Sequence, residues 1–396
     1  MRNALLFLVV LSMTPAGAAA QGWNENHEDR PPSHAALNLG VNGYGLSIGN
    51  SSRWNGLRIN WRDAELERIN GVNLTLWAPH GNAGGTVNGL SLGVGPVADE
   101  LNGVNIGLVG AVADDAMRGF NFATIGAVSQ GTMAGVNLAG IGLVSEDDMT
   151  GLNIGGIGLV SQGAMRGINL SLVGSVANDE MTGVNFGGVG LVSQATMRGL
   201  NIGGVGTVAE GDLLGVNIGG VAAVSQGDMR WVNIGGVATV SQRDMRWVNV
   251  GGVAAVAQGV ITGLTITGGA AVGMDGVYGL TVAGLDVGGK DTGPVEGVAA
   301  TLGAVDSGDM IQGLIVGGYR VRAPLVKGFS VNPVQLRVRD FTGVAIGVYN
   351  EVSNRQDGLV IGLFNRTRHL HGVQIGLLNY AENAAFPWLP LVNAKF

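Results

Sequence analysis

Residues 183–198 read GVNFGGVGLVSQATMR, and residues 199–214 read GLNIGGVGTVAEGDLL. This unit recurs from Gly103 to about Gly263 with a period of sixteen residues and no insertion or deletion. A fixed short period means that one structural unit is copied many times, so it determines the architecture before any motif is considered. It also argues against an enzyme, because a catalytic site needs unlike groups that converge on one point.

Two residue types mark the repeat. Methionine recurs as a packing row at Met117, Met133, Met149, Met165, Met181, Met197, Met229 and Met245, with Leu213 and Ile261 in the remaining places. Asparagine recurs as a candidate polar row, in a lumen or a ladder, at Asn105, Asn121, Asn137, Asn153, Asn169, Asn185, Asn201, Asn217, Asn233 and Asn249. This row fits two roles: amides around a lumen that bind or pass sugars and polar solutes, or amides that hydrogen-bond backbone groups at strand starts. We favour the second.

The composition is that of an ordered chain with an unusually apolar surface. Glycine accounts for 71 of 396 residues, charged residues for 13%, and the mean hydropathy is +0.31. Much of the surface must therefore meet something other than water or be buried by self-stacking. The net charge of −7 and the lack of a basic stripe make nucleic acid an unexpected partner. The absence of cysteine excludes disulfides, thiolate metal sites and an acylated lipid anchor.

The amino-terminal segment carries an export signal. Arg2 precedes an apolar stretch at 4–13, and Ala18-Ala19-Ala20 offers a cleavage site for small residues. These features predict a secretory signal peptide over residues 1–20. Residues 21–36 are polar and read as a flexible leader, and residues 37–396 form a single β-repeat domain with the strict array at 103–263. We expect export to the outer membrane or the cell surface.

Short alternating segments predict β-strands. Residues 56–62 place apolar and polar side chains on opposite faces, namely Leu57, Ile59 and Trp61 against Arg58, Asn60 and Arg62. Asn-Gly pairs, which favour type I′ hairpin turns, stand before the strands at Asn42-Gly43, Asn55-Gly56, Asn70-Gly71, Asn88-Gly89 and Asn102-Gly103. In the array we expect one strand per repeat, from Gly103 to Ala113 in the first, and on the order of twenty strands in all.

Two architectures accommodate this repeat: an up-and-down antiparallel β-barrel, with one strand and one turn per repeat, and a β-solenoid, with one sixteen-residue coil per repeat. The unbroken period and the Gly-Gly pairs, such as Gly155-Gly156, favour the solenoid. The sparse aromatic residues at repeat boundaries, Trp231 and Trp247 after arginines, count against a porin.

Four features favour the barrel. Acidic turns such as Glu146-Asp147 alternate with Ser-Gln turns such as Ser161-Gln162, which is expected if odd and even turns lie at opposite barrel ends. The Asn-Gly pairs favour hairpins, the variable connections suit a meander, and a terminal aromatic, Phe396, is usual in outer-membrane barrels. We therefore predict an all-β barrel of about twenty strands, with the solenoid as the alternative.

Three late copies of the repeat carry a resemblance. They begin at Gly343, Gly358 and Gly372 and end at Asn350, Asn365 and Asn379. The closing segment GVQIGLLNYAENAAFPWLPLVNAKF (372–396), with GLVIGLFN at 358–365, resembles the G-Φ-x-I-G-L-x-N units of uncharacterised bacterial surface-repeat proteins. The resemblance implies a cell-surface or outer-membrane location and no particular activity.

No pattern of catalytic or metal-binding residues is present. His369 and His371 are two residues apart without a third ligand, and the Gly-x-Gly runs lack the Gly-Lys-Ser/Thr of a phosphate loop. We therefore predict no cofactor and a non-enzymatic outer-membrane β-barrel, a pore or a surface structural protein. The alternative is an exported β-solenoid adhesin or scaffold. Expected partners are outer-membrane lipid and, for the asparagine row, small polar solutes or surface glycans; no oligomeric state is predicted.

Overall fold

The chain is all-β in a computed structural model that describes residues 35–79 and 83–396. Within these residues no α-helix is found, and so none long and apolar enough to cross a bilayer. The chain divides into two compact units, unit 1 up to Thr124 and unit 2 from Ile125 to Phe396. The predicted signal peptide and the leader up to residue 34 lie outside the described residues.

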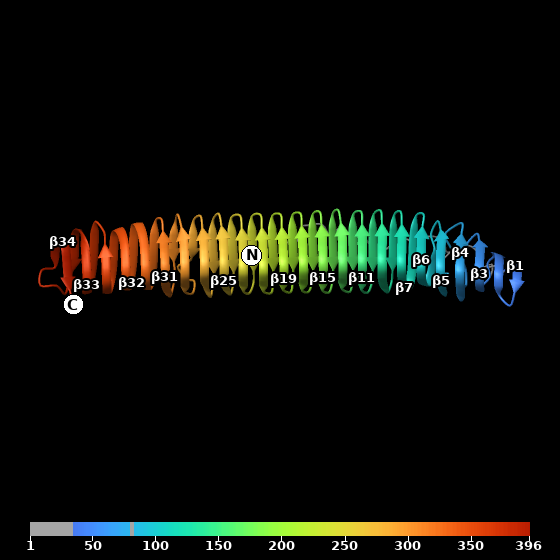
Figure 1. Cartoon of the computed structure of the whole chain (residues 1–396), viewed down its shortest axis with the longest axis horizontal. Helices are drawn as coiled ribbons and strands as arrows, with labels where there is room; N and C mark the ends of the chain where they lie inside the picture. Colours follow the sequence, from blue (N-terminus) through green and yellow to red (C-terminus); the bar gives the residue numbers. More distant parts are fainter. Residues whose placement is uncertain (1–34, 80–82) are drawn as a thin grey trace, which may run out of the picture. The chain divides into compact units, whose positions relative to one another are not determined.

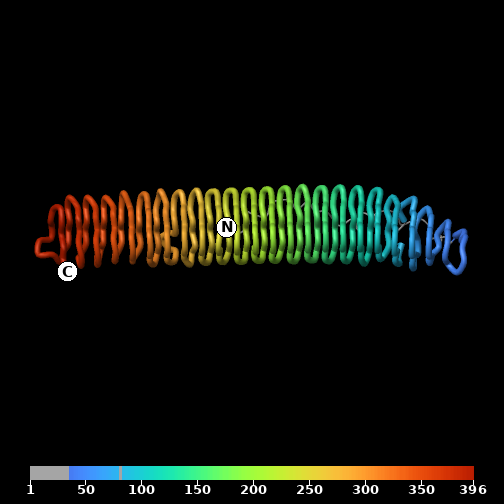
Figure 2. Tube along the Cα trace, in the orientation of Figure 1, coloured from blue at the N-terminus to red at the C-terminus, as the bar shows by residue number. Residues whose placement is uncertain are grey.

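Unit 2 is a β-solenoid in which each sixteen-residue repeat forms one coil of two strands. In one coil these are β11 (Met149–Gly155) and β12 (Gly158–Ser161), joined by a glycine-containing corner. β11 pairs in parallel with β9 and β13, and β12 with β10 and β14, so that Asn153 stands beside Asn137 and Asn169. Figure 1 shows such strands side by side with their arrows in one direction, and Figure 2 follows the successive coils.

The strands of unit 2 form two parallel ladders and a carboxy-terminal set of longer strands. The first ladder contains β9 (Thr132–Ala139), β11, β13 (Met165–Ser171), β15 (Met181–Gly187), β17 (Met197–Gly203), β19 (Leu213–Gly219), β21 (Met229–Gly235), β23 (Met245–Gly251), β25 (Val260–Thr267), β27 (Gly276–Ala283), β29 (Val295–Thr301) and β31 (Met310–Gly317). The second contains β8 (Gly126–Ser129), β10 (Gly142–Ser145), β12, β14 (Gly174–Ala177), β16 (Gly190–Ser193), β18 (Gly206–Ala209), β20 (Ala222–Ser225), β22 (Ala238–Ser241), β24 (Ala254–Ala257), β26 (Ala270–Gly273), β28 (Asp286–Gly288) and β30 (Ala304–Asp306). The last strands are β32 (Arg320–Ile361), β33 (Phe364–Ala381) and β34 (Trp388–Lys395).

Unit 1 is built on the same parallel plan after an initial hairpin. Its strands are β1 (Ala36–Val41), β2 (Tyr44–Gly49), β3 (Arg53–Asn60), β4 (Arg68–Thr75), β5 (Thr86–Gly93), β6 (Val97–Gly107) and β7 (Gly110–Ala123). β1 and β2 are antiparallel, whereas β2 to β7 pair in parallel in chain order.

The parallel pairing corrects the predicted barrel. An up-and-down barrel requires antiparallel neighbours, but here identical repeat positions stack in register, as Val144, Val160 and Val176 do. The strand predicted from Gly103 to Ala113 is interrupted by a corner at Leu108 and Val109, both of which are exposed. Each repeat therefore contributes two strands around a closed coil, and the solenoid alternative describes both units.

The Asn-Gly pairs mark a turn at one place and the middle of a strand at four others. Asn42 and Gly43 have φ angles of 52° and 78° and join β1 to β2, as a type I′ turn requires. The pairs at 55, 70, 88 and 102 instead lie within β3 to β6, and their glycines form a column of positive φ. A Cβ at Gly71 would lie 2.3 Å from the carbonyl oxygen of Gly56, so close backbone contact rather than chain reversal requires glycine there.

The alternating turns lie along one edge of the solenoid and not at opposite ends of a barrel. Ser145 and Ser161 are register partners, so the acidic turn after one and the Ser-Gln turn after the other are adjacent. Neighbouring coils are about 4.8 Å apart, and like charges at that distance repel each other. Because of the thirty-two-residue alternation, a Ser-Gln turn lies between two acidic turns. The alternation therefore reduces repulsion between the stacked turns of a solenoid.

The polar face of the strands is the inner one. Arg58 and Asn60 are buried, whereas Leu57 and Trp61 on the opposite face are exposed. In unit 2 the interior contains the methionine row, the asparagine row and a row of serine or alanine at the end of each short strand from β8 to β24. Towards the carboxy-terminal coils the interior also holds an aliphatic cluster that includes Val305, Ile311 and Val360, beside buried asparagines such as Asn350 and Asn365.

An antiparallel pair stands at the start of unit 1, where β1 meets β2, and at the end of unit 2, where β33 meets β34. β34 pairs antiparallel with β33, with a register shift where Pro390 lies, and a proline there cannot donate a ladder hydrogen bond. Phe396, predicted as the last residue of a barrel, follows β34 and is 88% exposed. Its place is beyond an edge strand rather than in a closing barrel strand.

Candidate functional site

The asparagine row of unit 2 forms a continuous ladder of side-chain amides. The Nδ2 of Asn153 donates to Oδ1 of Asn169 at 2.7 Å, and the same bond repeats from Asn137 to Asn249 at 2.6–3.0 Å. In unit 1 Asn105 donates to Asn121 at 2.7 Å. An amide carries both a donor and an acceptor, so a parallel in-register stack lets each side chain satisfy the next.

The ladder is inaccessible to a solute in the folded chain. Each asparagine of the candidate row is 0% exposed. These residues lie in the middle of their strands, and the bonds along the row join one amide to another. The row therefore satisfies buried polar groups and holds the register of the coils.

Two further asparagine ladders were not predicted. One joins the Asn-Gly pairs of unit 1, with Asn70 donating to Asn55 at 2.7 Å and Asn88 to Asn70 at 2.9 Å. The other joins the late repeats, with Asn350 donating to Asn365 at 2.8 Å and Asn365 to Asn379 at 2.7 Å. Their regular recurrence in the sequence is the signal that could have revealed them, once parallel stacking is assumed.

Unit 1 also buries an ion pair that sequence reasoning missed. Arg58 occupies the asparagine position of β3, is 0% exposed and pairs with the buried carboxylate of Asp63. Its guanidinium also donates to Oδ1 of Asn73 at 2.7 Å and of Asn50 at 2.6 Å. A buried charge is tolerated only when it is paired and hydrogen-bonded, and the two terminal nitrogens of this arginine meet that condition, whereas its Nε has no partner. The cluster is enclosed, so its role is structural.

The edge formed by the turns after the short strands is polar, and we call it the polar edge. It carries Gln162, Gln194 and Gln226 and the carboxylates Asp148, Asp212, Asp228 and Asp244. Oδ1 of Asp228 accepts the Asp244 amide at 3.3 Å, and Oδ1 of Asp244 accepts the Val260 amide at 3.0 Å. Each of these carboxylates thus accepts a backbone N–H of the next coil.

Arginines neutralise the polar edge where acidic residues fall in consecutive coils. Arg230 donates to Asp228 at 2.6 Å and Arg246 to Asp244 at 2.7 Å. Burial raises the pKa of Asp228, but the hydrogen bonds from Arg230 and the Asp244 amide outweigh it and hold the pKa below its ordinary value. The same carboxylate raises the pKa of Arg230. Both groups therefore stay charged over the physiological range.

The opposite edge of unit 2 is aliphatic, and we call it the apolar edge. It consists of one corner residue from each coil, 41–57% exposed: Ile125, Ile141, Ile157, Val173, Val189, Val205, Val221, Val237 and Val253. The apolar surface continues onto the two neighbouring faces through residues such as Phe186 of β15 and Val192 of β16. Around each coil of the strict array, most outward side chains away from the polar edge are apolar.

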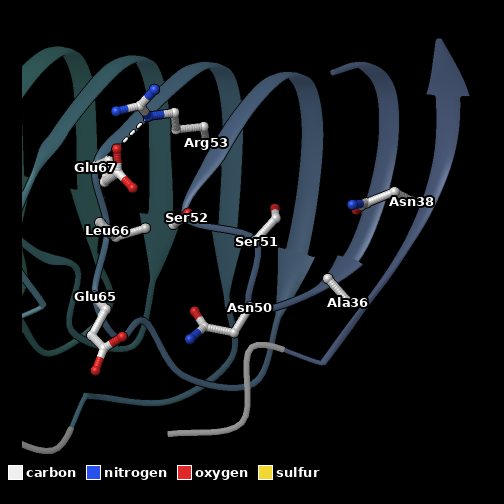
Figure 3. A pocket seen from close by; sticks show the side chains of 9 residues that line it. All are labelled: Ala36, Asn38, Asn50, Ser51, Ser52, Arg53, Glu65, Leu66 and Glu67. Atoms are coloured by element: carbon white, nitrogen blue, oxygen red, sulfur yellow. Dashed lines mark hydrogen bonds and ion pairs between the residues drawn. The ribbon is translucent and has the colours of Figure 1, made fainter. Parts of the chain in front are cut away.

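The hollow in Figure 3 does not converge on a chemical function. It lies in unit 1 between β1, the segment before β3 and the segment before β4, with Asn38, Asn50, Arg53 and Glu67 among its lining residues. Arg53 and Glu67 pair with each other, and both side chains are at least half exposed. A paired, solvated arginine and a few amides offer no activated group.

Among the described residues no three potential metal ligands come together. His371 lies 3.2 Å from Asp357, and its side chain is 62% exposed. Comparison with known proteins finds no family model, no curated protein and no solved structure that matches the chain. The fold alone defines the class of this protein as a β-solenoid. Because its interior polar groups are enclosed, a proposed function has to rest on the exposed surface of unit 2.

Proposed function

We propose that this protein is a non-enzymatic, exported β-solenoid scaffold that rests on a lipid surface through its apolar edge. The observation that carries the proposal is the division of each coil of unit 2 into an apolar edge and a polar edge. Export is supported by the signal-like segment at 1–20, and a bacterial cell-surface location by the resemblance of its late repeats.

The distribution of the apolar side chains favours lipid over a flat protein partner. The aliphatic surface runs along the corner and onto both adjoining faces. A second copy lying on one face would leave the edge and the other face in water, whereas a fluid acyl layer covers the edge and the adjoining part of both faces. Burying one half-exposed valine or isoleucine contributes on the order of 1 kcal/mol, so a row of them gives durable attachment.

The repeat supports a structural rather than a catalytic role. Successive coils of unit 2 present nearly the same outward residues, which suits a spacer or an attachment surface. The polar edge, with its glutamines and paired charges, would face water and other molecules. Under this proposal the buried asparagine ladder maintains the coil register.

A vesicle flotation experiment tests the proposal. The variant V189D/V205D/V221D places three charges on the apolar edge at half-exposed positions, and Q162D/Q194D/Q226D places the same charge on the polar edge. With uncharged phosphatidylcholine vesicles, wild type and the polar-edge variant should float and the apolar-edge variant should not. Wild type that stays unbound, or equal flotation of the two variants, would contradict the proposal. Fractionation and protease treatment of intact cells test export separately.

A further inference from the structure

A column of glycines in the first ladder of unit 2 is interrupted at two adjacent coils. In each first-ladder strand of the strict array the residue two places after the methionine row has a positive φ, and glycine fills this column from Gly135 to Gly215 and from Gly263 to Gly372. Trp231 and Trp247 stand in it with φ angles of 83° and 82°. They are register partners of each other and lie next to Gly215 and Gly263.

The two tryptophans occupy a position that disfavours any side chain. A Cβ built at Gly263 would lie 2.3 Å from the carbonyl oxygen of Trp247, and one at Gly215 would lie 2.2 Å from that of Gly199. A bulky residue at positive φ is a true outlier; such strain persists only where the surrounding structure holds the backbone, and it clusters at functional sites. The strained tryptophan occurs in two neighbouring coils, so we treat Trp231 and Trp247 as one feature.

The rings form an exposed aromatic platform. Their centroids are 5.5 Å apart with an interplanar angle of 6°, so each ring covers one face of the other and leaves one face free of its partner. Trp231 is 58% and Trp247 61% exposed. The flanking column positions are glycines, which have no side chain to lay over the rings.

Polar groups border the platform on the side of the polar edge. Arg230 and Arg246 precede the tryptophans and are held by Asp228 and Asp244. A shallow hollow on the polar edge includes these two aspartates and is also lined by Gln242, Arg243, Gln258, Gly259 and Asp275. Amides, carboxylates and guanidinium groups hydrogen-bond hydroxyls. Arg230 and Arg246 pair with Asp228 and Asp244, and the hollow adds one arginine, Arg243, and one further carboxylate, Asp275, so neither sign of charge prevails.

We infer that Trp231 and Trp247, with the glutamines and arginines beside them, form a binding site for a neutral saccharide. A pyranose ring presents an apolar C–H face that lies on an indole, and its hydroxyls reach the bordering polar groups. The site is nearer to the polar edge than to the apolar edge, since Trp231 is three residues from Asp228 and six from Val237. It remains in water when the apolar edge is covered, and it goes beyond the proposed attachment to lipid.

Calorimetric titration of the full chain with neutral hexasaccharides of glucose, mannose, xylose and N-acetylglucosamine tests the inference. We expect at least one to bind wild type, and W231G/W247G to bind at least tenfold more weakly while melting at the same or a higher temperature. W231N/W247N serves as a second variant, because asparagine tolerates a positive φ. Polysaccharides isolated from the producing cell, and others from plant or fungal walls, are titrated in parallel. Their relative affinities show whether the saccharide ligand comes from the cell itself or from another organism.

The matched control is W61A/W77A, which removes the other exposed stacked tryptophan pair, whose residues have no positive φ. It should bind like wild type. The inference is overturned if no hexasaccharide or polysaccharide binds wild type, if the glycine and asparagine variants bind normally, or if the control also loses binding. Loss of vesicle flotation in W231G/W247G without loss of saccharide binding would instead identify an interfacial anchor. The apolar-edge variant should keep saccharide binding, so the two proposals fail independently.

Discussion

In this fold a buried asparagine occupies an interior position that an aliphatic side chain fills in most parallel β-proteins, and it links neighbouring coils. Its amide replaces apolar packing with a chain of hydrogen bonds that runs from coil to coil at 2.6–3.0 Å in unit 2. Such a chain has two ends, and the ends are weaker than the middle. Nδ2 of Asn249 has no protein partner, because the next coil carries Thr265, whose hydroxyl is also unpartnered.

Loss of an amide should therefore depend on its place in the ladder. In Asn201→Ala both the donor of Asn185 and the acceptor of Asn217 lose their partner, and two unsatisfied buried groups cost about 2–5 kcal/mol. In Asn249→Ala only Asn233 loses its acceptor, so the cost is about 1–3 kcal/mol. Denaturant titration of the two variants measures the difference. Equal shifts in the unfolding midpoint would show that the ladder bonds do not carry the stability.

The carboxylates of unit 2 should make its stability fall in acid. Burial raises the pKa values of Asp148, Asp228 and Asp340, but hydrogen bonds from arginines and backbone amides outweigh it and lower them below 3.8. The folded state then binds protons more weakly than the unfolded state, so the stabilisation is complete above about pH 4 and is lost as the pH falls through the lowered values. Thermal unfolding between pH 7 and pH 2 measures this. Asp228→Asn should give a shallower decline than wild type, and an identical acid profile would contradict the assignment.

At the scale of the strands, much of the repeat could be predicted and its pairing could not. The period, the all-β character and the corners at Gly155-Gly156 are evident in the sequence. Parity along a strand separates Asn153 from Leu152 and Ile154, but it does not say which face is inside. The polar face is the inner one because stacked amides hydrogen-bond each other there. Those hydrogen bonds form only when the coils stack in parallel and in register.

The Asn-Gly pairs illustrate the same limit. The dipeptide requires positive φ wherever it occurs, at Asn42-Gly43 in a turn and at Gly71 within a strand. Local chemistry determines the backbone angle, but contact with the neighbouring coil determines whether the chain reverses. The Trp231–Trp247 site was likewise visible only as two aromatics after arginines, since its strain depends on the glycine column around it.

Parallel stacking predicts which exposed residues can be cross-linked. Val160 and Val176 are register partners on the outer face of β12 and β14. Parallel neighbours are about 4.8 Å apart, within the roughly 4.4–6.8 Å between Cα atoms that a disulfide spans. V160C/V176C should therefore oxidise to an intramolecular disulfide, which a mobility shift or mass spectrometry detects. V160C/V192C is the control, because two coils separate its cysteines by about 10 Å and it should stay reduced. Failure of V160C/V176C to form the disulfide would contradict the in-register parallel pairing of β12 and β14.

For the whole chain, the sequence period and the structural units do not coincide. The sixteen-residue array begins at Gly103, yet the division into compact units falls after Thr124. Unit 1 places Arg58 where unit 2 places an asparagine and pairs it with Asp63 from the segment after β3, so its interior is irregular although its strands follow the same plan. In a solenoid each coil contacts its neighbours alone, and stability is the sum of such contacts. Changes confined to one unit should therefore leave the other folded.

The same one-dimensional construction leaves an open strand edge wherever the stack ends. In unit 2, β34 covers the edge of β33 from Gly372 to Tyr380, and Pro390 interrupts further pairing. Removing residues 387–396 exposes a row of unpaired N–H and C=O groups, which is a template for pairing with another chain. We expect the truncated protein to self-associate with rising concentration, as measured by size-exclusion chromatography with light scattering. Leu391→Ser in the full chain removes a 69% exposed apolar residue but keeps the strand, so it should behave as wild type. A truncated chain with an unchanged mass at every concentration would show that β34 is not what protects this edge.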